Sequence, residues 1–225
     1  MGCDGSGCFS GDSQVRMADG STKMVCDLVK GDRVSTDRGT SVIVCKTMTW
    51  GTFMVYNVGH DGSSTWLTQY HPYAADYIAL LDGEFRHPAT KATRFVDRVY
   101  NLVTEHSAVQ FAGGEFAVTY GHGLTGGLVE HSFFGTGAII RALKRLDPVG
   151  FDSGFVDMTN FKEIRDRLNH WVVDLELKTS FERIQEIGTT FFATKRAIAS
   201  RLGRLGRMMT RSMTTTSLPS EGIVA

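Results

Sequence analysis

The sequence has little proline, no net charge and no long apolar run. Only four of its 225 residues are proline, and 24 Lys and Arg balance 24 Asp and Glu. A chain without an overall electrostatic field gives no support to a nucleic-acid partner, and we expect none. No apolar run approaches the roughly 18–20 residues that span a bilayer, and the first thirty residues do not have the layout of a secretory signal. We therefore expect a soluble, cytoplasmic protein.

Cysteine is scarce as well. The four cysteines, at positions 3, 8, 26 and 45, are irregularly spaced, without a second Cys pair or a His pair at the intervals that a zinc site needs. We therefore expect no metal site. Glycine, in contrast, is abundant, and 25 glycines imply the many tight turns that are typical of a β-rich protein.

The first half of the chain has the pattern of an all-β domain. Short segments rich in Val, Tyr, Phe and Thr alternate with turn signals from residue 8 to about 125. The clearest pair, residues 14–18 and 22–25, flanks Asp19-Gly20 and predicts a hairpin. The further predicted strands are residues 33–36, 41–50, 53–58, 65–68, 98–104, 108–111 and 115–119.

The last third changes character. Asn160 and Glu163 form a helix-start signal, and apolar residues then recur at helical spacing to Leu175. Thr179 starts a second predicted helix. We expect residues 126–159 to be a connecting region, 160–209 a helical appendage with a basic tail, and 210–225 disordered.

The basic tail is the one strongly charged segment. It carries six Lys and Arg between Lys195 and Arg211, and no acidic residue before Glu221. Two interpretations stay open: a solvated, fraying helix weakened by Gly203 and Gly206, or a contact for an anionic membrane or protein. At the other end, the first six residues fit a myristoylation pattern, which makes a lipid anchor at Gly2 and Cys3 a further hypothesis.

Four residues of the β region suit acyl-transfer chemistry. The first is Cys8. Thr68 and His71 form a Thr-x-x-His motif, and His122 lies between two glycines. Each has an ordinary structural alternative: a buried thiol, a strand threonine, a loop histidine and a strand cap. A fifth candidate, His131, is expected instead to pack near Phe133 and Phe134.

The order of these segments resembles the Hint (hedgehog/intein) autoprocessing superfamily. The resemblance rests on residues 8–9, 15–21, 28–34, 66–72, 99–103 and 116–122, and so covers roughly half of the chain. Residues 121–124, 131–136 and 152–156 are most similar to the eukaryotic branch in which a Hint domain follows a von Willebrand A domain. The resemblance implies a mainly β, Hint-type horseshoe of short strands over residues 8–125, with the helical part as a C-terminal appendage.

The resemblance also implies autocatalytic cleavage at Gly7-Cys8. The Cys8 thiol attacks the preceding carbonyl and gives a thioester, while His71 protonates the leaving amide nitrogen. Thr68 holds either the carbonyl or the amide by a hydrogen bond, and His122 assists. The substrate is the short upstream segment, residues 1–7, and no cofactor is needed. Water, a thiol or an amine stays open as the nucleophile that resolves the thioester.

Departures from the family decide which reaction is expected. Gly123 follows His122 where splicing inteins have the Asn that cyclises, so we expect cleavage rather than full splicing. Thr47 stands where hedgehog proteins carry the Asp that activates cholesterol, so sterol transfer is not expected. Asn101 replaces the carboxylate of an intein-like Tyr-Asp step, and His106 is a weak candidate to substitute for it.

Two rival functions remain. The first is a catalytically idle Hint fold that acts as a binding or structural module, with the helices and basic tail making the contacts. The short upstream segment and the missing terminal Asn favour it, whereas the joint presence of Cys8, Thr68 and His71 favours activity. The second, a cysteine peptidase acting on other proteins, is less favoured because the sequence indicates no substrate cleft.

Overall fold

The structure is a computed structural model that describes residues 7–60, 63–89 and 92–161. The chain divides into two compact units, Met1–Val172 and Val173–Ala225, and all described residues belong to the first. The predicted helices after Asn160, the basic tail and the hypothetical lipid anchor lie outside the described residues, and these predictions remain predictions. Across the described ranges, no helix is long and apolar enough to span a bilayer.

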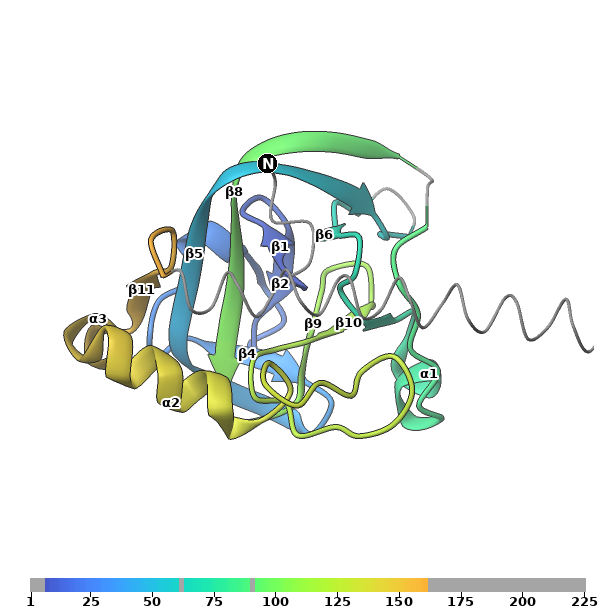
Figure 1. Ribbon diagram of the computed structural model, residues 1–225. Helices are drawn as coiled ribbons and strands as arrows, with labels where there is room; N and C mark the ends of the chain where they lie inside the picture. Colours follow the sequence, from blue (N-terminus) through green and yellow to red (C-terminus); the bar gives the residue numbers. More distant parts are fainter. Residues whose placement is uncertain (1–6, 61–62, 90–91, 162–225) are drawn as a thin grey trace, which may run out of the picture. The chain divides into compact units, whose positions relative to one another are not determined.

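The described part of the chain is mainly β, as predicted (Figure 1). A two-stranded sheet pairs β2 with β3, and the other described strands form one sheet in the order β6-β1-β8-β5-β4-β9-β10-β7, with β11 also beside β5. The strands are β1 (Phe9–Ser10), β2 (Gln14–Arg16), β3 (Thr22–Met24), β4 (Arg33–Thr36), β5 (Gly39–Asn57), β6 (Trp66–Thr68), β7 (Tyr73–Ala74), β8 (Thr93–Thr104), β9 (Ala108–Gln110), β10 (Phe116–Val118) and β11 (Phe155–Asp157).

The predicted hairpin is confirmed. Gln14 pairs with Met24 and Arg16 with Thr22, across a turn in which Gly20 adopts a positive φ of 87°. A side chain is disfavoured in this left-handed conformation, which explains the glycine. A short 3-10 helix, η1 (Val25–Asp27), follows directly.

Strands β5 and β8 form a long antiparallel pair at the centre of the main sheet. The pairing runs from Ile43 opposite Thr104 to Tyr56 opposite Thr93. The sequence predicts two strands, 41–50 and 53–58, where the structure has one strand with a register shift between Trp50 and Phe53. Such irregularities let a strand bend. The start of β5 therefore pairs with β4, and its end pairs with β6.

The main core lies between the short strands and this pair. It is built from fully buried apolar side chains that include Phe9, Leu28, Leu67, Leu102 and Phe111. Each side chain of this size contributes roughly 1.5–3 kcal/mol when it is removed from water. This burial brings strands that are distant in sequence to the start of β1.

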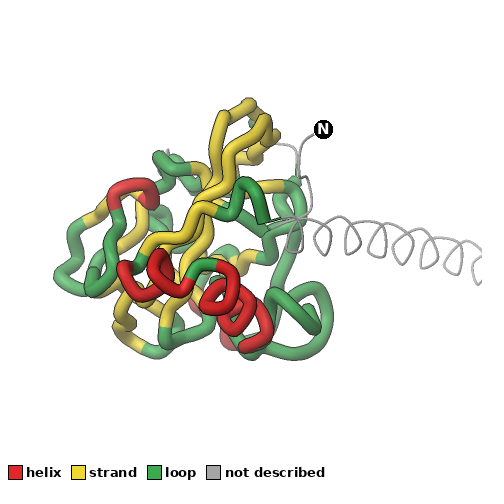
Figure 2. The backbone as a smooth tube through the Cα atoms, turned by 60° about the vertical axis from the view of Figure 1, so that its left-hand side comes forward, coloured by secondary structure: helices red, strands yellow, loops and turns green. Residues whose placement is uncertain are grey.

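Residues 126–159 contain elements that were not predicted from the sequence. Thr136 caps α2 (Gly137–Leu146) by accepting the N–H of Ala138, and Asp147 caps α3 (Pro148–Ser153) in the same way. Ile139, Leu143, Phe151 and Val156 are buried together with residues of β5 and β8 in a second core. In Figure 1, α2 crosses beside the ends of these strands, and Figure 2 shows the same helices against the sheet from another side.

A third helix, α1 (Tyr77–Leu81), is one short turn after β7. Asp76 caps it by accepting the N–H of Ala79. It lies beside a small cluster in which Ala79 packs with Ala74 and Phe116.

Candidate active site

The peptide bond between Gly7 and Cys8 lies directly before β1. Strand β1 pairs with β6 through Phe9 and Leu67, and with β8 through Phe9 and Tyr100. These two pairings bring residues about sixty and ninety positions further along the chain to the two sides of this bond.

Thr68, at the end of β6, holds the amide side of the bond. The Cys8 N–H donates to Thr68 Oγ1 at 2.9 Å, and the Thr68 N–H donates to the Cys8 carbonyl at 3.0 Å. Both residues are only 1% exposed. Of the two alternatives that the sequence leaves open for Thr68, the structure has the contact with the amide.

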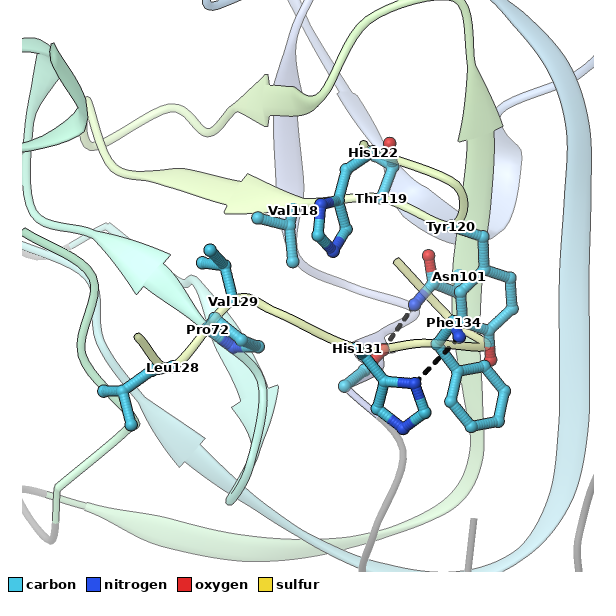
Figure 3. Close-up of a pocket in the computed structure, with 11 residues that line it drawn as sticks. Pro72, Asn101, Val118, Thr119, Tyr120, His122, Leu128, Val129, His131 and Phe134 are labelled. Carbon is cyan, nitrogen blue, oxygen red and sulfur yellow. Dashed lines mark hydrogen bonds between the residues drawn. The ribbon is translucent and has the colours of Figure 1, made fainter. Parts of the chain in front are cut away.

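Asn101, in β8, holds the carbonyl side. Its Nδ2 donates to the Gly7 carbonyl oxygen (Figure 3), while its Oδ1 accepts the Leu102 N–H at 2.7 Å. The Leu102 N–H needs an acceptor, so Oδ1 of Asn101 must face Leu102, and the NH₂ group is therefore directed at Gly7. Sequence reasoning noted Asn101 only as a lost carboxylate. The signal available in the sequence is a polar residue inside the apolar run 99–103, and the structure buries it to 2% exposure.

His71 is fully buried against Gly7. Its Nε2 lies 2.9 Å from the Val118 carbonyl oxygen, and a carbonyl can only accept, so the ring proton is on Nε2. The other nitrogen, Nδ1, lies on the Gly7 side, because a Cβ on that glycine would be 3.2 Å from it. Burial lowers the pKa of His71 to about 4, although backbone hydrogen bonds with Val118 and Cys8 raise it. The ring is therefore neutral at pH 7, with a lone pair on Nδ1.

The Cys8 side chain is buried among Phe53, Val55 and Val99. Tyr120 approaches it from another direction. Burial raises the pKa of Tyr120 well above its usual value of 10, and the charge of Cys8 and a hydrogen bond with its side chain add to the effect. The phenol therefore stays protonated beside the thiol. The sequence analysis missed Tyr120, because nothing local distinguishes a tyrosine that follows β10.

His122 and His131 form a second group. His122 Nδ1 accepts the Leu124 N–H at 3.0 Å, and His131 Nδ1 accepts the N–H groups of Phe133 and Phe134, both at 3.0 Å. Burial lowers the pKa of each histidine to about 4, so both are neutral at pH 7. The ring of His131 also lies 4.8 Å from that of Phe134, so the expected packing is confirmed.

Both histidines and Gly7 line one small cavity, whose lining residues are drawn in Figure 3. Its volume is about 40 Å³, and its lining includes Gly7, Asn101, Tyr120, His122 and His131. The structure thus brings Thr68 to Cys8 and His71 to Gly7, while His122 lines the cavity that Gly7 borders. Within the described ranges, no three His, Cys, Asp or Glu side chains gather as a metal site.

Comparison with known proteins gives a family. A family model described as Vint, a Hint-domain, matches residues 7–174, well over half of the chain. No curated protein matches. The association with a von Willebrand A domain stays a prediction.

Two crystal structures of the gp41-1 intein, one of them with three substitutions, are similar to this chain. Each is 12% identical and covers 51% of the chain. The substituted intein has a TM-score of 0.34 with 99% of its own chain covered, and the other has 0.33 with 98% covered.

Proposed function

The chain belongs to the Hint-domain family, and from this premise we propose that it cleaves its own backbone between Gly7 and Cys8. The reaction begins with an N-to-S acyl shift, in which the peptide bond becomes a thioester on Cys8 and a free α-amine. One observation carries the proposal: Asn101 and Thr68 hold the two sides of this single peptide bond. Buried backbone groups are normally hydrogen-bonded to other backbone groups, whereas here a side chain from β6 and a side chain from β8 take both positions and fix the orientation of this one bond.

His71 moves the proton in this scheme. At pH 7 its Nδ1 has a lone pair and no proton to give, because burial lowers the pKa of the ring to about 4. It must therefore first take the proton of the Cys8 thiol. The Sγ then forms a bond to the Gly7 carbonyl carbon. When the carbon–nitrogen bond breaks, the imidazolium returns the proton to the departing nitrogen.

Asn101 stabilises the intermediate. As Sγ adds, negative charge develops on the Gly7 oxygen, which already accepts from Asn101 Nδ2. A fixed donor in a buried site is worth about 10²–10³ in rate. Thr68 is a positioning residue, because accepting the Cys8 N–H fixes the orientation of the scissile peptide. Tyr120, beside the thiol, supplies a phenol that stays neutral during the reaction.

The outcome is cleavage, with water or another nucleophile releasing the upstream segment. The intein-type second step needs an Asn directly after His122, and Gly123 has no side chain to cyclise. The part of the chain that follows Cys8 therefore stays intact in this scheme.

The test is the intact mass over time of a reporter domain fused ahead of Gly7, with and without hydroxylamine. We expect release between Gly7 and Cys8, acceleration by hydroxylamine, and no release from Cys8→Ala. If wild type and Cys8→Ala both stay whole while folded, the proposal is wrong. The alternative, an idle Hint fold that acts as a binding module, would then be favoured.

A further inference from the structure

The cavity described above borders the reacting carbonyl. Gly7 and Asn101 both line it, and Asn101 donates to the Gly7 oxygen at its edge. The Cys8 side chain packs instead with Phe53 and Val55, in a cluster that shares none of the residues lining the cavity. A molecule in the cavity would thus lie beside the Gly7 acyl group, with Tyr120 between the cavity and the Cys8 side chain.

The size of the cavity restricts its occupant. About 40 Å³ is room for one or a few water molecules, since a single water needs about 10–15 Å³ on the same measure. Sites for larger organic ligands have volumes of about 300–1,000 Å³. Val129, 5% exposed, and Leu128 form apolar parts of the wall, so widening the space would require these side chains to move.

His122 supplies a polar group to this space. Because its Nδ1 accepts the Leu124 N–H, the proton of the neutral ring is on Nε2. Figure 3 shows the ring directed into the space between Val129 and Asn101. His122 therefore offers a hydrogen-bond donor and no lone pair, which suits it to hold the oxygen of a nucleophile and not to act as a general base.

From this geometry we infer that the cavity is the acceptor site for thioester cleavage, that the acceptor is water, and that His122 positions it. The inference rests on the proposed function and names its second substrate. The water oxygen bonds to the Gly7 carbonyl carbon, and the bond from that carbon to Sγ breaks with its electron pair on sulfur. One proton of the water passes to Sγ. The products are a carboxylic acid at Gly7 and the Cys8 thiol. Two groups with a lone pair can carry this proton from the water to Sγ: the α-amine that the acyl shift frees, and His71 Nδ1.

The experiment measures two quantities for the reporter fusion in ¹⁸O-labelled water. One is the rate at which reporter acid is released. The other is the amount of accumulated thioester, counted as reporter hydroxamate after a denaturing hydroxylamine quench. We expect one ¹⁸O in the released carboxyl group. Under native conditions the ratio of the hydroxylamine rate to the glutathione rate should be higher for the folded protein than for an unstructured peptide thioester, because the small cavity disfavours the larger nucleophile.

Substitutions of residues that line the cavity test whether it is the acceptor site. Val129→Phe fills the cavity and should slow hydrolysis roughly tenfold to 100-fold, with the thioester accumulating. Val149→Phe, the same change at a side chain 78% exposed in α3, is the matched control and should behave as wild type. Val129→Ala enlarges the cavity and should raise the glutathione rate relative to the hydroxylamine rate. His122→Phe should likewise lower the rate with water, with the thioester accumulating.

The outcomes separate the two proposals. If no hydroxylamine-sensitive bond forms in the wild type, the proposed function itself is wrong. If the thioester forms but Val129→Phe hydrolyses it at the wild-type rate, the cavity is not the acceptor site. Should Val129→Phe fail to fold, an unchanged nucleophile preference in Val129→Ala would equally overturn the inference.

Discussion

Replacing Asn101 gives the sharpest test of the proposed chemistry. Asn101→Leu keeps the approximate size of the side chain but removes the Nδ2 donor that contacts the Gly7 oxygen. Asn101→Asp keeps an acceptor for the Leu102 N–H, which lies 2.7 Å from Oδ1, and puts a second oxygen where the donor was. Both variants leave the charge that develops on the Gly7 oxygen without its donor.

The magnitude follows from the site. Loss of one buried donor to a developing oxyanion costs about 2.7–4 kcal/mol of the barrier, which is about 10²–10³ in rate. Asn101→Leu also leaves the Leu102 N–H without its acceptor, which costs about 1–3 kcal/mol of stability. The effect on rate must therefore be separated from the effect on folding.

The assay is the rate of hydroxylamine-dependent release of an upstream reporter, together with the thermal unfolding temperature of each variant. Thr104→Val is the matched control. Thr104 lies in β8, as Asn101 does, and the change removes its hydrogen bonds with His106 and Thr119, neither of which involves Gly7. We expect it to lose stability and to keep its rate. If folded Asn101→Leu and Asn101→Asp release the reporter at the wild-type rate, Asn101 does not stabilise the intermediate.

Three further predictions concern positioning and stability. Thr68→Val removes the acceptor of the scissile N–H and should slow thioester formation about tenfold or more in the same assay; an unchanged rate would remove its positioning role. Burial lowers the pKa of His71 to about 4, below 6.5 for the unfolded residue, so between these values only the unfolded chain binds the proton. His122 and His131 add to the loss of stability between pH 7 and pH 4, so urea denaturation should show a fall in the free energy of unfolding that is about 3 kcal/mol smaller in His71→Gln than in wild type. Equal falls in the two proteins would contradict neutral burial of His71. Gly154→Ala, at φ 92°, brings a Cβ within 2.3 Å of the Lys30 side chain. Calorimetry should show it to be more destabilising than Gly20→Ala, which has a similar φ and open space around it.

Local signals predicted several short strands of the fold, but not β1 or β7. The hairpin of β2 and β3, and the strands β4, β9 and β10, follow from alternation and turn glycines, which are properties of neighbouring residues. The bend in β5 did not follow, because a register shift depends on the partner strand β8. Helices α2 and α3 were not predicted either, although their N-caps Thr136 and Asp147 and the amphipathic pattern of α2 are local helix signals. Strand β11 did not follow because it depends on pairing with β5.

The same division holds for the candidate site. The order of Cys8, Thr68 and His71 along the chain was enough to suggest the family and the reactive bond, because these residues lie in motifs of recognisable sequence. Asn101 and Tyr120 belong to the site only because β1 pairs with β8 and the chain after β10 passes the thiol. The cavity is a tertiary feature of the same kind, since its walls come from residues as far apart in sequence as Gly7 and Phe134. The sequence by itself thus determined which bond is the candidate for cleavage, and only the tertiary structure decided which groups meet its carbonyl.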